Sequence, residues 1–172
     1  IRPLFPKGYR RETQIIATVL SMDQENDPDV LAMIGASAAL ELSDIPFQGP
    51  IASVRVGRRN GQLEVNPRLG DCPECDINII VAGSRTGIVM VEGGGNLVSE
   101  QDMLEAIYFG HAAIQPIIDM QLELKAALGV PKQVWALPAK DEALVAQVEA
   151  AARDLLRAAL CTPTKVQRNQ AL

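Results

Sequence analysis

The stretch IASVRVGRRNGQLEV, residues 51–65, carries a strong signal for β-structure. Apolar and polar residues alternate along much of it, which is typical of strands that bury one face. Asn60-Gly61 interrupts the alternation, and this pair is a strong signal for a two-residue turn between antiparallel strands. The stretch therefore predicts a β-hairpin.

A second hairpin is predicted a few residues further on. The runs INIIVAG (77–83) and IVMVEGG (88–94) are apolar and of strand length, and SRTG separates them as a turn. The polar segment NPRLGDCPECD (66–76) joins the two hairpins and is expected to be a loop. Four strands thus occupy the middle of the chain.

The residues before the hairpins predict one strand and one helix. TQIIATVLSM (13–22) has the composition of a buried strand. Asp27 is a good N-cap and Pro28 suits a first helical position, so we expect a helix over about 28–42. The helix start would suit an anion, yet Asp29 follows within the first turn and repels one.

Helices are also predicted after the hairpins. Ser99 with Asp102 approximates a capping box, and a helical period then runs to Gly129 with Pro116 as a kink. VPKQVWALP (130–138) is a linker, and an amphipathic helix follows from Asp141 to Leu160. We therefore predict an α+β domain over residues 1–130 and the start of a helical unit over 131–172.

Composition limits the classes of protein. The chain has 172 residues, 48% of them hydrophobic, and a net charge of −5, which allows one well-filled core and argues against wholesale coating of a polyanion. Its apolar runs are too short to cross a membrane, and three cysteines do not make a disulfide framework. We expect a cytoplasmic protein with no membrane partner. Because the first residue is Ile1, we also expect a piece of a longer chain.

Several residues invite a catalytic interpretation that a structural one answers better. EGGGN (92–96) lacks the spacing of a phosphate loop and is expected to be a strand-to-helix turn with positive φ. His111 has no nucleophile at a fixed offset, and Asp71 and Asp76 suit a polar loop without catalysis. Cys72 and Cys75 form a single C-x-x-C without a second ligand pair, so an ordinary loop is favoured over a zinc site.

Basic residues gather in two places. Residues 1–11 hold four cations and no acid, whereas residues 12–54 hold seven acids and no Lys or Arg. The four are Arg2, Lys7, Arg10 and Arg11. Arg55 and Arg59 lie on the same face of a predicted strand, and this face is either solvated or directed at RNA. From the residues alone, no self-sufficient active site emerges.

Three long strings resemble polynucleotide phosphorylase in the right order. They are RPLFPKGY (2–9), IIATVLSMDQENDPDVLAMIGASAALELSDIPFQGPIASVRVGR (15–58) and VAGSRTGIVMVEGGGNLVSEQDMLEAIYFGH (81–111). The resemblance implies a partial RNase PH-like core of the ribosomal protein S5 domain 2-like fold, the first of two, followed by an all-helical linker. It also implies a phosphate-dependent 3′-to-5′ exoribonuclease that releases nucleoside diphosphates. The implied cofactor is Mg²⁺, and the implied partners are RNA, inorganic phosphate, a homotrimer and RNA-degradation complex proteins.

The same resemblance implies that the catalytic groups lie elsewhere. It places Asp27, Pro28 and Asp29 where the family's second core has phosphate-binding serines. Asn66 and Cys72 fall where that core has its metal-binding aspartates. We therefore predict no catalytic and no metal-binding residue in this chain, with Mg²⁺ bound outside it and the chain inactive alone.

RNA handling and ring assembly then remain for this part of the protein. Arg2 matches an arginine that lies near the family's substrate path, and its guanidinium would bind RNA phosphate or form an interdomain salt bridge. Lys7, Arg10 and Arg11 lie where the family varies and receive no role. Asn78 replaces a common aspartate of the family's strand. The alternative is a non-catalytic, RNA-binding ring subunit of an exosome-like assembly.

Overall fold

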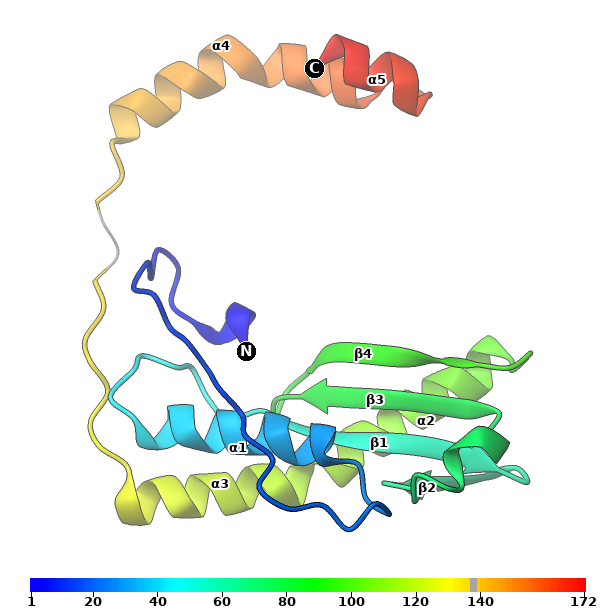
Figure 1. Ribbon diagram of the computed structural model, residues 1–172. Coiled ribbons are helices and arrows are strands. Elements are labelled where there is room, and N and C mark those ends of the chain that lie inside the picture. Colours follow the sequence, from blue (N-terminus) through cyan, green and yellow to red (C-terminus); the bar gives the residue numbers. More distant parts are fainter. Residues whose placement is uncertain (137–138) are drawn as a thin grey trace. The chain divides into compact units, whose positions relative to one another are not determined.

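The computed structural model spans residues 1–172 and describes all of them except 137–138. The chain divides into two compact units, Ile1–Trp135 and Ala136–Leu172, which are described separately (Figure 1). The sequence predicts a domain boundary after residue 130, and this boundary stays a prediction. The two compact units divide a few residues later, so that residues 131–135 belong to the first unit.

Both predicted hairpins are present in one antiparallel sheet. The strands are β1 (Ala52–Arg59), β2 (Gln62–Val65), β3 (Ile77–Gly83) and β4 (Ile88–Gly95), in the order β2-β1-β3-β4. Asn60 and Gly61 have φ values of 52° and 77°, which a type I′ turn requires of both central residues. The local turn signal therefore sets the register of the first pair, in which Arg59 faces Gln62.

Two helices follow the sheet and complete its core. They are α2 (Glu100–Ala113) and α3 (Gln115–Leu128); α2 packs against β1 and β3, and α3 packs against α1 (Pro28–Leu42). The core consists of strand and helix side chains with almost no exposure: Ala52, Val54, Val56, Ile77, Ile79, Val81, Ala106, Ile114 and Ile118. Gly110 permits the close approach of α2, because a Cβ there would lie 2.9 Å from Val56 and 3.0 Å from Val81.

The helical stretch after the hairpins is broken rather than kinked. Ser99 caps it as predicted, with its hydroxyl oxygen accepting from the backbone N–H of Asp102 at 3.1 Å. The prediction of one helix bending at Pro116 was wrong in form: α2 ends before Ile114, and Pro116 lies in the first turn of α3. There its missing N–H costs nothing, because first-turn N–H groups have no intrahelical partner.

The strand-to-helix turn predicted over the glycine-rich residues 92–96 begins later in the chain than expected. Residues 92–95 belong to β4, and the turn into α2 comes after them, with Leu97 at φ 53°. Positive φ is required at Gly93 (φ 137°), where a Cβ would lie 2.2 Å from the carbonyl oxygen of Asn78. Gly93 therefore lets the backbones of β4 and β3 approach closely.

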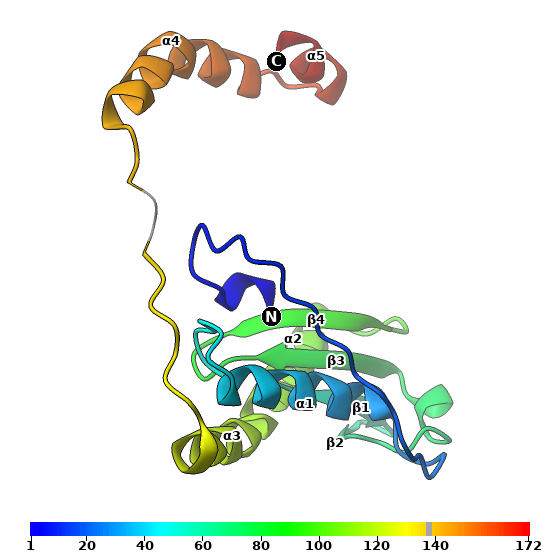
Figure 2. The same ribbon diagram turned by 60° about the vertical axis from the view of Figure 1, so that its left-hand side comes forward.

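Helix α1 (Pro28–Leu42) confirms the predicted helix, whereas the strand predicted over residues 13–22 is wrong. This segment is extended but belongs to no strand, and it runs beside α1 (Figure 2). A strand needs a neighbour with free backbone groups, and the described residues supply none here. Its side chains are accordingly open to solvent, with Ile16 76% and Leu20 93% exposed.

The remaining elements are short turns and the second unit. Two 3₁₀ turns, η1 (Arg2–Leu4) and η2 (Cys72–Glu74), lie in the first unit. The second unit contains α4 (Glu142–Leu160), which the sequence predicted, and α5 (Lys165–Ala171), which it did not. Within the part of the chain that the structure describes, no helix is long and apolar enough to cross a membrane. The linker prediction includes residues 137–138, which lie outside the described residues.

Candidate functional site at the start of helix α1

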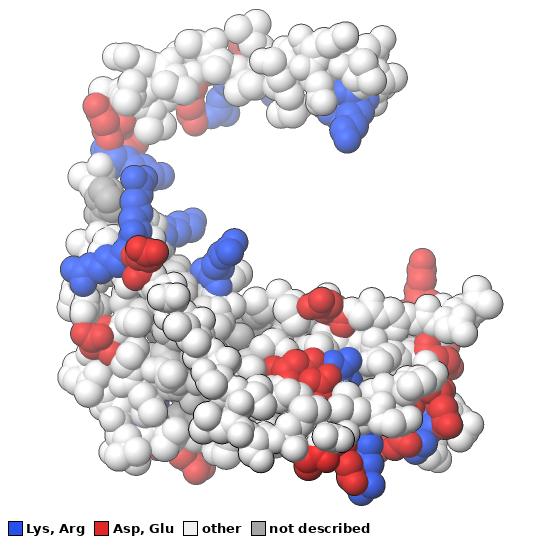
Figure 3. All heavy atoms as spheres, viewed as in Figure 1, with Lys and Arg blue, Asp and Glu red and all other residues white. Residues whose placement is uncertain are grey.

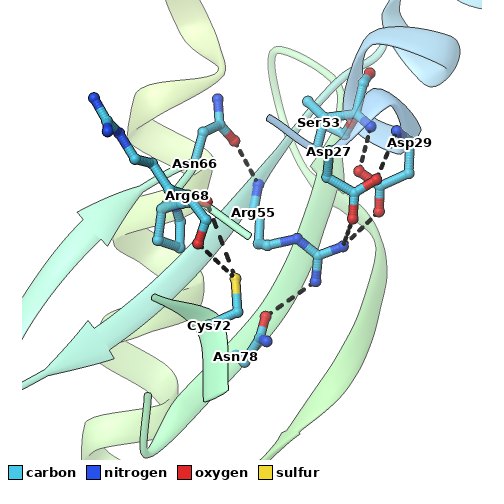
Figure 4. A network of polar contacts seen from close by, with 10 residues as sticks. Asp27, Asp29, Ser53, Arg55, Asn66, Arg68, Cys72 and Asn78 are labelled. Carbon is cyan, nitrogen blue, oxygen red and sulfur yellow. Dashed lines mark hydrogen bonds and ion pairs between the residues drawn. The ribbon is translucent and has the colours of Figure 1, made fainter. Parts of the chain in front are cut away.

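Four polar side chains from three elements meet at the N-terminus of α1 (Figure 4). Asp27 is the N-cap of this helix and Asp29 lies in its first turn. Arg55 comes from β1 and Asn78 from β3, where Asn78 pairs with Gly57. Because Gly57 lies two residues beyond Arg55, the side chains of Arg55 and Asn78 are diagonal neighbours on the same face of the sheet.

The guanidinium of Arg55 holds this cluster together. Its Nη2 donates to Asp27 Oδ2 at 3.0 Å and to Asp29 Oδ2 at 2.5 Å, and its Nη1 donates to Asn78 Oδ1 at 3.0 Å. The Arg55 side chain is only 17% exposed. Its Nε is buried without an acceptor among the described residues, so its charge is compensated by the two carboxylates at Nη2, while Nη1 donates to the neutral amide of Asn78. Because these charge-assisted contacts are partly buried, they hold the start of the helix against the sheet.

The N–H groups of the helix start are also occupied. Asp27 Oδ1 accepts from the backbone N–H of Asp29 at 3.1 Å, and Asp29 Oδ1 accepts from that of Val30 at 2.6 Å. A phosphate at this helix start would need these donors and would meet two carboxylates instead. Arg55, the cation of this cluster, already pairs with both carboxylates. The arrangement is therefore unsuited to an anionic substrate.

The residues that align with metal-binding aspartates do not fit Mg²⁺. Asn66 Oδ1 accepts from the backbone N–H of Arg55 at 2.9 Å, and the Asn66 N–H donates to the Arg55 carbonyl at 2.7 Å. Cys72 Sγ lies 3.4 Å from the carbonyl of Arg68, and a thiol is a poor ligand for a cation that prefers carboxylates. No group of three or more His, Cys, Asp or Glu side chains could hold a metal among the residues described.

The arginines of the first hairpin form ion pairs. The face shared by Arg55 and Arg59 was expected to be either solvated or directed at RNA, and Arg55 fits neither expectation because it is largely buried and paired with Asp27 and Asp29. Arg59 also forms an ion pair, with its Nη1 2.9 Å from Asp71 Oδ1.

Arg58 forms ion pairs with Asp76 at 2.8 Å and with Asp102 at 3.2 Å. Its guanidinium lowers the pKa of Asp76, chiefly by hydrogen bonding. The pKa of Asp102 is also lowered, most strongly by a hydrogen bond from Ser99 and next by one from Arg58. These contacts join the sheet to its loop and to α2.

The other residues singled out from the sequence have structural contacts. His111 Nε2 lies 3.0 Å from the carbonyl oxygen of Ser84, which joins α2 to the β3–β4 turn. Cys72 and Cys75 are both unbridged, and burial raises the pKa of the Cys75 thiol. Arg2 is exposed in η1 and is not part of the cluster around Arg55. The role of Arg2 in binding RNA stays a prediction.

Sequence reasoning identified the acidic helix start and missed the partner that balances it. Arg55 lies 26 residues after Asp29, and no local spacing rule connects a helix cap with a strand residue at that distance. The available signal was indirect: a run of seven acids without a cation, over residues 12–54, ends immediately before Arg55. Such a run needs a cation wherever two of its carboxylates approach each other.

Comparison with known proteins identifies the class to which this fold belongs. Residues 49–113 match the 3′ exoribonuclease family, domain 2. The crystal structure of rice (Oryza sativa) Rrp46 superposes with a TM-score of 0.53 at 18% identity, covering 60% of this chain and 50% of that one, which supports the fold alone. Residues 49–113 form a domain of the 3′ exoribonuclease family, with an RNase PH-like α+β fold.

Curated relatives make the relationship more specific. The chain is 57% identical over 172 residues to a polyribonucleotide nucleotidyltransferase of Desulfosudis oleivorans, covering all of this chain and 24% of that protein. The protein of that name from Syntrophotalea carbinolica is 52% identical over 172 residues, covering all of this chain and 25% of that protein. Along its whole length the chain is a homologue of the polyribonucleotide nucleotidyltransferases. It spans about a quarter of the length of these relatives.

Proposed function

We propose that this chain is part of a phosphate-dependent 3′-to-5′ exoribonuclease that degrades RNA to nucleoside diphosphates, and that this part is not catalytic. The ion-pair cluster of Asp27, Asp29 and Arg55 is the observation that carries the second half of the proposal. It lies where the resemblance places a phosphate-binding turn in the family's second core. Two carboxylates at that position disfavour phosphate electrostatically.

In this proposal the chain contributes to RNA binding and to assembly of a homotrimeric ring. Mg²⁺ is held outside residues 1–172, because Asn66 and Cys72 do not offer carboxylates where the metal would be needed. The exposed guanidinium of Arg2 binds RNA phosphate along the substrate path, with an interdomain salt bridge as its alternative role. The parent protein acts on RNA in the cytoplasm, together with other proteins of RNA degradation.

Product analysis of the full-length parent protein tests the activity. Incubation with oligo(A) and Mg²⁺ should release nucleoside diphosphate when inorganic phosphate is present and none when it is absent. Release of nucleoside monophosphate without phosphate would contradict phosphorolysis, because it would mean that water is the attacking group.

A scaffold without activity is the second candidate. The absence of a usable phosphate or metal site in the described residues favours it, since a non-catalytic RNA-binding ring subunit of an exosome-like assembly would show the same feature. The two candidates differ in the sequence of the parent beyond this chain. A second core with a serine-rich turn and two loop aspartates supports the enzyme, and a parent that binds oligo(A) without forming any product supports the scaffold.

A further inference from the structure

The cations of the first unit divide into two groups by their partners. Each arginine between residues 12 and 135 pairs with a carboxylate: Arg55, Arg58, Arg59, Arg68 and Arg85. Lys125 pairs with Glu41, and Lys132 donates to three backbone carbonyls. Among the described residues, the four cations of residues 1–11 have no carboxylate partner. Lys and Arg side chains accordingly gather around this N-terminal segment (Figure 3).

A tight turn presents the first of these cations. The backbone N–H of Tyr9 donates to the carbonyl of Pro6 at 3.0 Å, and Gly8 has φ 78°. This is the pattern of a type II turn, with Lys7 and Gly8 at its two corners. Lys7 is therefore held outward at the corner, and its side chain is exposed.

Aromatic contacts fix the segment to the rest of the first unit. The ring centroids of Phe5 and Tyr9 lie 5.4 Å apart and stack, and those of Tyr9 and Trp135 lie 5.0 Å apart edge to face. Phe5 also contacts the buried Phe47 at 5.8 Å. Such pairs prefer these separations, and they anchor the backbone while Arg10 and Arg11 remain exposed. The cations are thus preorganised rather than carried on a loose tail.

Arg11 is oriented without being neutralised. Its Nη1 donates to Gln133 Oε1 at 2.7 Å, and Gln133 Nε2 donates to Asp44 Oδ2 at 2.6 Å. A neutral amide therefore stands between this guanidinium and the carboxylate behind it. Glu12 is exposed and ends the basic run in the sequence.

We propose that Lys7, Arg10 and Arg11 form a basic strip that binds the phosphates of single-stranded RNA independently of base sequence. RNA is chosen as the polyanion because the strip belongs to a proposed exoribonuclease, so its assignment rests on the proposed function. An anionic membrane surface is the competing polyanion, because the segment that follows the strip exposes apolar side chains such as Ile16 and Leu20, and the vesicle experiment below tests it. The strip extends the RNA contact predicted for Arg2 to residues that the resemblance left without a role.

Binding of fluorescein-labelled oligo(A) and oligo(U) to the 172-residue chain, followed by anisotropy over a range of salt concentrations, tests the strip. In the variant Lys7→Gln/Arg10→Gln/Arg11→Gln, affinity should fall at least tenfold for both RNAs. The slope of log affinity against log salt should become shallower by about 2, because each lost phosphate contact removes about 0.7 for a single strand.

The matched control is Arg68→Gln/Arg85→Gln/Arg153→Gln, which changes the net charge equally but removes exposed arginines that already have carboxylate partners. Its affinity should stay within twofold of the unmodified chain. Equal losses in both variants would overturn the strip in favour of net charge, and so would unchanged binding in the first variant. Circular dichroism of each variant verifies that the fold is retained.

Two further arms separate the strip from other outcomes. If vesicles of phosphatidylserine and phosphatidylcholine bind the chain and the triple variant loses that binding alone, the strip is a membrane site and the RNA assignment is overturned. Phosphorolysis by the parent protein is measured separately. A parent that forms no nucleoside diphosphate overturns the proposed function, while the loss of RNA binding in the triple variant would still support the strip.

Discussion

Arg55 and Asp29 join a strand of the sheet to the first turn of helix α1, with Arg55 Nη2 2.5 Å from Asp29 Oδ2. The contact has a structural and a functional consequence. It holds the start of the helix against the sheet, and it neutralises the cation that an anionic substrate would otherwise meet. One pair of residues thus explains both the stability of this corner and its unsuitability for phosphate.

Replacing Arg55 with Met should destabilise the chain by about 1.5–3 kcal/mol, because two half-buried carboxylates would lose charge-assisted partners. Urea unfolding followed by circular dichroism measures the change. Arg68→Met is the control: Arg68 is 69% exposed in its pair with Glu25, and surface pairs contribute about 0–1 kcal/mol. Equal effects in the two variants would show that the Arg55 cluster is an ordinary surface pair.

Removing the carboxylates should open the corner to anions. In the variant Asp27→Ser/Asp29→Ser, hydroxyl donors replace the carboxylates and Arg55 is freed, so inorganic phosphate should bind in the millimolar range, about −4 kcal/mol. Titration calorimetry with phosphate measures this binding, and the unmodified chain should show none at this corner. Adding Arg55→Met should abolish the new binding. A double variant that folds and still binds no phosphate would mean that the carboxylates are not what excludes it.

Much of this fold could be predicted from the sequence because its signals are local. Asn60-Gly61 determines a hairpin through the φ values of two adjacent residues, and Ser99 caps α2 through a bond within one turn. Apolar runs such as residues 77–83 form buried strands because a neighbour is available a few residues away.

The errors arise where a structure depends on residues far apart in the sequence. Residues 13–22 have the composition of a strand, but composition does not supply the neighbouring backbone that a strand requires. The partnership of Asp29 with Arg55 likewise depends on packing between α1 and β1, so spacing could not reveal it. The excess of positive charge in residues 1–11 was visible from the sequence. Only the structure showed that these cations have no carboxylate partner among the described residues.

Acid should weaken the contact between the sheet and α2. Arg58 contributes to lowering the pKa values of Asp76 and Asp102 in the folded chain below the ordinary value of 3.8. These contacts therefore stabilise the fold above pH 3.8, and the stabilisation is lost as the pH falls through the lowered pKa values. The free energy of unfolding, measured in urea between about pH 5 and pH 2, should therefore decrease toward acid.

The variant Arg58→Gln provides the comparison. It should be less stable than the unmodified chain at neutral pH, and the difference should shrink as the two carboxylates are protonated. Arg85→Gln, which removes an exposed pair with Asp119, should show little such convergence. A difference between Arg58→Gln and the unmodified chain that is constant with pH would contradict the role given to Arg58.

Lys132 closes the other end of α1. Its Nζ donates to the carbonyls of Leu40, Glu41 and Ser43 at 2.6, 3.1 and 2.8 Å, which satisfies acceptors at the helix C-terminus. Lys132→Met should destabilise the first unit by about 1.5–3 kcal/mol and speed amide hydrogen exchange in the last turn of α1. Lys140→Met is the control, since Lys140 lies in the other unit. Exchange that accelerates equally throughout the first unit would contradict a local role.

We predict that this part of the protein does not perform phosphorolysis. The most direct measurement is the release of nucleoside diphosphate from oligo(A) by the isolated 172-residue chain, compared with an equimolar amount of the full-length parent under the same Mg²⁺ and phosphate. Phosphate-dependent release is expected from the parent and none from the chain. Robust phosphate-dependent release by the chain alone would contradict this prediction.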